Sequence, residues 1–181
     1  MVAATPRLET ERLALRRWDV EADLDAYAAI SADPEVMRFI ADGATRSRED
    51  CAEQLEAFER TWNECGFGLF ALERTDSGEL IGFTGLATPD FLPEILPAVE
   101  IGWRLGRAHW GQGLATEAAT AALAFGFERV GLDRIVSVHT VGNDASGRVM
   151  QKLGMHLDRE TVHPVHGVAV RVYAIDRPAT G

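Results

Sequence analysis

Val99-Glu-Ile-Gly-Trp-Arg-Leu-Gly-Arg-Ala-His-Trp-Gly-Gln-Gly-Leu-Ala-Thr-Glu-Ala118 carries the clearest pattern in this 181-residue chain. Its first part, residues 99–105, predicts a strand. A short polar turn and the glycines Gly111 and Gly113 then lead into an alanine-rich pattern that predicts a helix. Glycine has no Cβ, so its backbone N–H groups can approach a ligand closely. Because the N–H groups at a helix N-terminus also lack helical partners, this order of elements predicts a site for an anionic, phosphate-bearing cofactor.

Two better-known phosphate-binding motifs do not fit these glycines. Gly106 and Gly111 have the spacing of a P-loop, but the Lys and Ser/Thr that contact phosphate and Mg²⁺ are missing. Gly111-x-Gly113 begins like a dinucleotide fingerprint, but Thr116 stands in place of the third glycine. The candidate acid of that motif, Asp133, precedes the next predicted strand instead of following it. Both nucleotide-binding interpretations are therefore excluded.

The composition is typical of a globular protein, with 46% hydrophobic and 25% charged residues. Acidic residues outnumber basic ones by 28 to 18, and the formal charge of -10 disfavours a nucleic-acid partner. No secretion leader and no apolar run of about 18 residues is apparent, so we expect one domain, residues 1–181, in the cytoplasm and without membrane contact. Cys51 and Cys65 are predicted to be buried and reduced, because one helix would separate them by about 21 Å, beyond the limit of about 7 Å for a disulfide.

The remaining patterns predict an α/β (α+β) fold with a mixed sheet. We expect seven strands, at residues 10–16, 67–73, 80–88, 99–105, 134–140, 155–162 and 168–175. We expect about four helices, at residues 19–31, 47–65, 113–130 and 144–153, with a short helical turn beginning at Pro34. Asp19 is the expected cap of the first helix, Ser47-x-x-Asp50 resembles a capping box for the second, and Gly131 is expected to end the third. A helical crossover joins the strands at 99–105 and 134–140, so these two are predicted to be parallel. The hairpins around them must be antiparallel.

Two motifs resemble those of one enzyme family. Trp110-x-x-Gly113-x-Ala115 resembles the acyl-CoA signature Gln/Arg-x-x-Gly-x-Gly/Ala of the GNAT acetyltransferase superfamily, although Trp110 departs from the usual first residue. Trp-Gly-Gln-Gly-x-Ala after Glu-Ile-Gly-Trp-x-Leu is similar to the RimJ/RimL-type branch, the ribosomal-protein N-terminal acetyltransferases. The segment from Asn143 to Met155 resembles the family element Asn-x-x-Ser/Ala-x-x-x-x-x-Lys-x-Gly-Phe. The resemblance, which covers nearly the whole chain, implies a mostly antiparallel sheet whose parallel pair splays apart around CoA.

The resemblance also implies a function. It indicates an acetyl-CoA-dependent N-acetyltransferase that moves an acetyl group to a primary amine by direct attack in a ternary complex. A protein or peptide α-amine is the expected acceptor. Two alternatives stay open: an acetyltransferase for a small amine (an amino acid, polyamine or antibiotic), and a catalytically weak acyl-CoA-binding regulatory module. A homodimer is an open possibility, and no metal is implied.

The predicted cofactor contacts follow from the same resemblance. The backbone of the glycine turn and of the first helical turn is expected to hold the pyrophosphate. The backbone of the preceding strand is expected to pair with pantetheine like an added strand, and a bulge there would aim an N–H at the thioester carbonyl. Asn143 is expected to hydrogen-bond pantetheine, to cap its helix, or both. The predicted cofactor-binding residues are Trp103, Arg104, Leu105, Trp110, Gly111, Gln112, Gly113, Leu114, Ala115, Thr116 and Asn143.

Two residues are predicted to be catalytic. Glu100 is the predicted general base, acting through water, because burial in an apolar strand would raise its pKa; the alternative is an outward-facing, solvated Glu. Where many GNAT members have a Tyr acid, this chain has Met150, and the resemblance suggests Ser146 in its place. The alternative for Ser146 is a hydroxyl that satisfies the first turn of its helix. His163 and His166 are too few for a metal site, so we expect a polar hairpin turn there.

Overall fold

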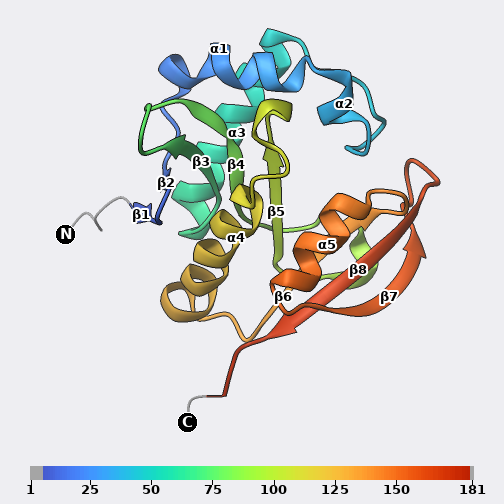
Figure 1. Cartoon of the computed structure of the whole chain (residues 1–181). Helices are drawn as coiled ribbons and strands as arrows, with labels where there is room; N and C mark the ends of the chain where they lie inside the picture. The colour runs from blue at the N-terminus through green and yellow to red at the C-terminus, as the bar shows by residue number, and fades with distance from the viewer. Residues whose placement is uncertain (1–5, 180–181) are drawn as a thin grey trace.

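The computed structural model describes residues 6–179, and these contain a single eight-stranded sheet (Figure 1). Its strand order is β1-β2-β3-β4-β5-β6-β8-β7, and every neighbouring pair is antiparallel except β5 and β6. The strands are β1 (Leu8–Glu9), β2 (Leu13–Arg16), β3 (Leu69–Arg74), β4 (Leu80–Ala87), β5 (Glu100–Leu105), β6 (Arg134–Thr140), β7 (His156–Val162) and β8 (Ala169–Asp176). The predicted fold class, a mixed sheet with one parallel pair, is confirmed.

Five helices lie between the strands in the described part of the chain. They are α1 (Val20–Ser31), α2 (Pro34–Met37), α3 (Arg48–Cys65), α4 (Leu114–Phe125) and α5 (Asp144–Lys152). None of them is long and apolar enough to cross a membrane. The predicted box of Ser47 and Asp50 caps α3, and Asp19 caps α1 through the N–H of Ala22.

The counts of seven strands and four helices are too low, for local reasons. Thr10 and Leu13 close a tight turn through the Thr10 hydroxyl, so the predicted strand at 10–16 is shortened to β2, and a strand that was not predicted, β1, lies before this turn. The turn at Pro34 is a short helix in its own right, with Asp33 as its cap. Cys51 is buried as predicted, but Cys65 is exposed, because it is the last residue of α3 and faces solvent beyond the packed layer.

The predicted helix at 113–130 changes character after Phe125. Residues Gly126–Val130 form a π-helical turn that ends at Gly131, whose φ is 85°. Phe125 and Phe127 are both buried.

The helices cover both faces of the sheet. On one face, α1 and α3 pack against the strands through Tyr27 and Leu55, together with Phe83 of β4. On the other face, α4 packs through its small residues, including Ala118 and Ala122. Figure 1 shows α4 and α5 on the two sides of β5. A cavity lies between these elements.

The parallel pair β5 and β6 is joined over a very short length. Glu100 is opposite Val136, and the N–H of Val136 donates to the carbonyl of Val99 at 2.9 Å. Beyond Glu100 no further backbone pair is present within the described residues, so the two strands diverge. This divergence leaves one edge of β5 free of a neighbouring strand.

Candidate active site

A cavity of about 450 Å³ lies beside the free edge of β5. Its wall is built from the end of β5, the glycine turn, the first turn of α4, one face of α5, and the segment of residues 35–40 at α2. Four side chains in this wall are positively charged, Arg38, Arg104, Arg148 and Lys152, and one, Glu35, is negatively charged. A basic cavity in a chain of net charge -10 is suited to an anionic ligand.

The glycine turn presents free backbone donors to this cavity. Gly111 and Gly113 have φ of 70° and 78°, a left-handed conformation that favours glycine. Gly113 is the N-cap of α4, and no side chain caps this helix. The first helical hydrogen bond runs from the N–H of Glu117 to the carbonyl of Gly113 at 3.0 Å. The N–H groups from Leu114 to Thr116 therefore have no partner within the helix and can bind a phosphate oxygen.

The turn is held in place by the N-terminal hairpin. The Glu117 carboxylate accepts hydrogen bonds from the Thr10 hydroxyl at 2.7 Å and from the Arg12 backbone N–H at 2.8 Å. Burial works against ionisation of Glu117, but these donors and the Arg12 guanidinium keep its pKa below the ordinary value. Arg12 Nη1 also donates to the carbonyl of Gln112 at 2.9 Å. The side chain of Gln112 donates to the Ala108 carbonyl and does not line the cavity.

Alternate residues of β5 point their backbone groups into the gap beside β6. Ser137 of β6 donates its hydroxyl to the Ile101 carbonyl at 2.8 Å. The Trp110 indole donates to the Leu105 carbonyl at 2.9 Å. Trp103 lies between these two positions, so its N–H and carbonyl face the same gap. This is the geometry of a strand edge that can accept an extended amide-bearing ligand.

Arg104 has the opposite orientation. Its backbone lies against β4, opposite Phe83, and a Cβ on Gly82 of β4 would lie 2.0 Å from the Arg104 carbonyl oxygen. Only the side chain of Arg104 therefore reaches the cavity. The register of β4 and β5 is continuous from Glu100 to Leu105, so the predicted bulge in β5 is wrong. Glycine in β4 allows the close, regular pairing that leaves no residue of β5 unpaired.

Glu100 occupies the last position before β5 and β6 diverge. The residue is partly exposed, yet burial of its carboxyl group raises the pKa from 4.5 to about 8, while a backbone hydrogen bond from Val138 works in the other direction. Glu100 does not belong to the residues that line the cavity.

Asn143 and Ser146 lie on the opposite wall, at the start of α5. The side-chain oxygen of Asn143 accepts the N–H of Ser146 at 3.3 Å and so caps the helix. The Asn143 side chain thus satisfies a donor of this first turn without the Ser146 hydroxyl. Both residues line the cavity. Met150, one turn further along, is only 1% exposed and belongs to the core.

A match to a known family model extends over most of this architecture. Residues 12–156 match the model of the acetyltransferase (GNAT) domain. The chain belongs to the GNAT acetyltransferase family. It is therefore an acyltransferase, and enzymes of this family use acetyl-CoA.

Individual GNAT relatives agree with this assignment. YoaA of Bacillus subtilis, an uncharacterized N-acetyltransferase, is 32% identical over 149 residues, which cover 82% of this chain and 82% of YoaA. An acetyltransferase from Agrobacterium tumefaciens has a TM-score of 0.81 at 28% identity and covers 98% of each chain. RimL, the ribosomal L7/L12 α-N-protein acetyltransferase, solved in complex with coenzyme A, has a TM-score of 0.80. Its identity is 17%, over 97% of this chain and all of RimL, which shows a shared fold.

The structure brings most of the predicted GNAT site together. All predicted cofactor-binding residues except Gln112 line the cavity, as does Ser146, whereas Glu100 lies outside the lining. Two parts of the lining, the segment of residues 35–40 and Arg148, were not predicted from the sequence. A signal for Arg148 was present in the sequence. Arg148 and Val149 follow Ala145 by three and four residues along one helix, and this spacing indicates a shared helix face. No comparable pattern marks the segment at 35–40.

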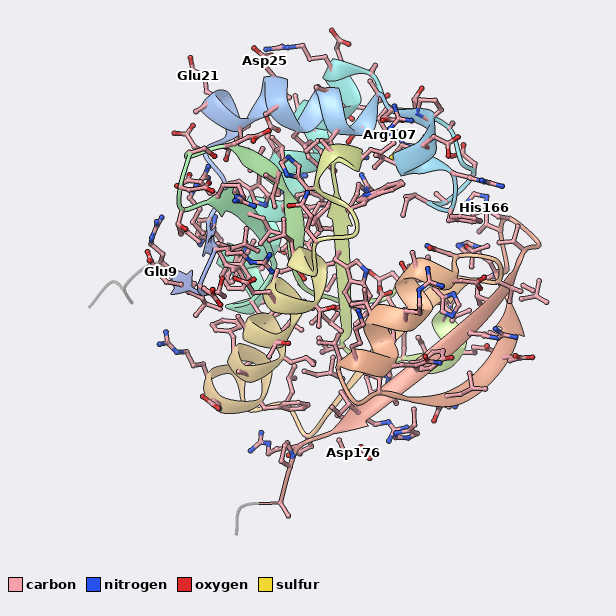
Figure 2. All side chains as sticks on the ribbon, in the orientation of Figure 1. Glu9, Glu21, Asp25, Arg107, His166 and Asp176 are labelled. Atoms are coloured by element: carbon pink, nitrogen blue, oxygen red, sulfur yellow. The ribbon has the colours of Figure 1, made fainter. Side chains whose placement is uncertain are left out.

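The two histidines of the β7–β8 hairpin form a turn. Nδ1 of His163 accepts the backbone N–H groups of Val165 and His166 at 3.2 Å and 3.3 Å. His166 is labelled at the tip of this hairpin in Figure 2. Across residues 6–179, no group of three or more His, Cys, Asp or Glu side chains is arranged to hold a metal ion.

Proposed function

We propose that this GNAT domain is an acetyl-CoA-dependent N-acetyltransferase acting on a primary amine, with a protein or peptide α-amine as the acceptor. The observation that carries the proposal is the cavity beside the free edge of β5, which also contains the uncapped start of α4. When bound, acetyl-CoA supplies the acetyl thioester. The residues present fit this molecule, because the cavity offers donors for phosphate at one side and a strand edge for amides at another.

The chain provides distinct groups for distinct parts of the cofactor. The N–H groups from Leu114 to Thr116 hold the pyrophosphate, and Arg148 and Lys152 of α5 add positive charge on the facing wall. The free N–H and carbonyl of Trp103 pair with the pantetheine amides. Asn143 caps α5 and also lines the cavity on the same wall as Arg148 and Lys152.

Two side chains move protons in this proposal. Glu100 takes the proton of the ammonium group through a water molecule, and its pKa of about 8 is matched to that of an amine. The Ser146 hydroxyl donates a proton to the sulfur that departs. Neither cysteine lines the cavity, so the amine attacks directly, without an acyl-cysteine on the enzyme.

The finer assignments are proposals as well. We place the protein in the RimJ/RimL-type branch because of the Trp110-Gly-Gln-Gly-x-Ala motif. A cytoplasmic location agrees with such an activity. A small amine is the second candidate acceptor.

The test is thiol release from acetyl-CoA in the presence of a panel of amines, with products identified by mass spectrometry. We expect release with peptides that have a free α-amine and none with the same peptides blocked at the N-terminus. Release with small amines alone would replace the peptide acceptor with a small one. Acetyl-CoA binding without release with any amine would instead indicate a regulatory binding module.

A further inference from the structure

Arg104 has a largely buried guanidinium group, and no acidic partner for it is present in the described part of the chain. Its Nη1 donates to the Tyr27 hydroxyl at 3.2 Å, and its Cζ lies 5.0 Å from the ring centroid of Phe83. Its Nε is buried and has no hydrogen-bond partner. Within residues 6–179, no Asp or Glu side chain forms an ion pair or hydrogen bond with it.

Other partly buried arginines of this chain are paired. Arg16 binds the carboxylates of Asp23 and Glu73, and Arg17 binds the carboxylate of Glu59. The lack of a partner is thus not general to arginines at this depth. It concerns Arg104, which is partly buried and lines the cavity, whereas the other two arginines of the lining, Arg38 and Arg148, are exposed.

The surroundings of Arg104 favour an incoming negative charge. Burial is the main cause that lowers the pKa of Arg104, and the positive charge of Arg46 contributes in the same direction. A desolvated charge without a counter-ion is unfavourable, and a bound anion removes that penalty. The planar guanidinium fork is also the side chain best shaped to bind a carboxylate through two hydrogen bonds.

The position of Arg104 relative to Glu100 gives this anion site a role. Side chains alternate along a strand, so Glu100, Gly102 and Arg104 share one face of β5. A Cβ on Gly102 would meet no atom within 4 Å, so the face between the two charged residues is open. The Cα atoms of Glu100 and Arg104 are separated by about 13 Å along the strand. The two charged groups can lie closer together than this, because both side chains can extend toward each other. A molecule held at Arg104 can therefore extend along this face toward Glu100.

We propose that Arg104 determines acceptor specificity by binding a carboxylate group of the amine acceptor. The preferred acceptor is then an amine that also carries a carboxylate. The inference rests on the proposed acetyltransferase function and goes beyond it by naming the acceptor chemistry. Two sources supply this chemistry, a free amino acid and a peptide with an acidic residue near its N-terminus.

The experiment compares matched acceptors that differ only in the anionic group. β-Alanine is compared with β-alaninamide, and a peptide with Asp at its second position is compared with the same peptide containing Asn. Values of kcat/KM are expressed per unprotonated amine, so that differences in amine pKa cancel. We expect the wild-type enzyme to prefer the carboxylate member of at least one pair by about tenfold to a hundredfold, the range of a hydrogen bond to a charged group. The preferred pair identifies the source.

Variants assign the preference to the residue. Arg104→Gln should bring the carboxylate-to-amide ratio to about one, and Arg104→Lys, which keeps the charge without the fork, should give an intermediate ratio. The ratio compares two acceptors on the same enzyme preparation, so partial loss of folded protein does not alter it. The control is Arg107→Gln, because Arg107 (labelled in Figure 2) is an exposed arginine that pairs with Asp33 and should leave the ratio unchanged.

A measurement on wild-type protein covers the case in which the Arg104 variants do not fold. Succinate should inhibit competitively against the amine acceptor and more strongly than succinamide. Equal inhibition by the two, equal kcat/KM within every acceptor pair, or an unchanged ratio in folded Arg104→Gln would each overturn the inference while leaving the acetyltransferase function intact. If no amine in the panel is acetylated, the proposed function fails, and the inference fails with it.

Discussion

Replacing Glu100 with glutamine removes a carboxyl group whose pKa burial raises from 4.5 to about 8. Only the ionised carboxylate accepts a proton, so the competent fraction of wild-type enzyme is about 1% at pH 6 and about 90% at pH 9. Wild-type turnover should therefore rise about tenfold from pH 6 to pH 7 and level off above pH 8. In Glu100→Gln, kcat at pH 9 should be lower by about 10²–10⁴, and this rise should disappear.

Folding stability should respond to the same substitution in the opposite direction. Between about pH 5 and pH 8 the unfolded chain releases the Glu100 proton while the folded protein retains it, so the folded state loses stability as the pH rises. The rise of the pKa from 4.5 to about 8 corresponds to a loss of about 5 kcal/mol above pH 8. This value is an upper limit, because the residue is partly exposed and solvent screens its charge. Glu100→Gln should therefore raise Tm relative to wild type at pH 8 and leave it unchanged near pH 4.5.

The assay is thiol release across pH 6–9, reported as the ratio of wild-type to variant rates so that titration of the amine acceptor cancels. Acetyl-CoA affinity, measured in parallel, should change little. The matched control is Glu64→Gln, an exposed glutamate on α3 far along the chain from β5. A Glu100→Gln enzyme with unaltered kcat and the wild-type pH profile would refute the assignment of Glu100 as the base.

Three further substitutions test other parts of the account. Ser146→Ala should slow turnover by about tenfold to a hundredfold with acetyl-CoA binding retained; a lower Tm with normal kcat would instead make the hydroxyl structural. Met150→Tyr should lower the free energy of unfolding by about 1–3 kcal/mol in urea titrations, because a larger, polar side chain enters a buried site. Phe70→Ala should cost about 3–5 kcal/mol, since the ring is fully buried between Trp62 and Phe125, and unchanged urea stability would contradict that packing.

The features that were predictable from the sequence are those set by neighbouring residues. The capping box of Ser47 and Asp50 and the helix stop at Gly131 depend on a few adjacent groups, and both were predicted. β6 was predicted at its observed bounds, because apolar and polar residues alternate along it and a predicted helix lies on each side of it in the sequence. The strand Leu8–Glu9 was missed, because two residues carry no periodicity and the strand exists through its pairing with β2.

The same distinction explains the site. The glycine turn, the start of α4 and the end of β5 are contiguous in sequence, so their common position could be predicted from one motif. The segment at residues 35–40 reaches the cavity only through the packing of α2 in the folded chain. The absence of an acidic partner for Arg104 likewise depends on every carboxylate in its surroundings. Neither property leaves a local pattern in the sequence.

The central claim, that the glycine turn and the start of α4 bind the acyl-CoA phosphates, is tested most directly by calorimetric titration of acetyl-CoA into Gly113→Glu. Gly113 has φ of 78° and lines the cavity, so the substitution places a side chain and a negative charge at the phosphate site. The control is Gly78→Glu, which introduces the same residue at a φ of 72° in a hairpin turn with open space around it. Wild type and Gly78→Glu should bind acetyl-CoA, and Gly113→Glu should not. A folded Gly113→Glu protein with wild-type affinity would contradict the claim.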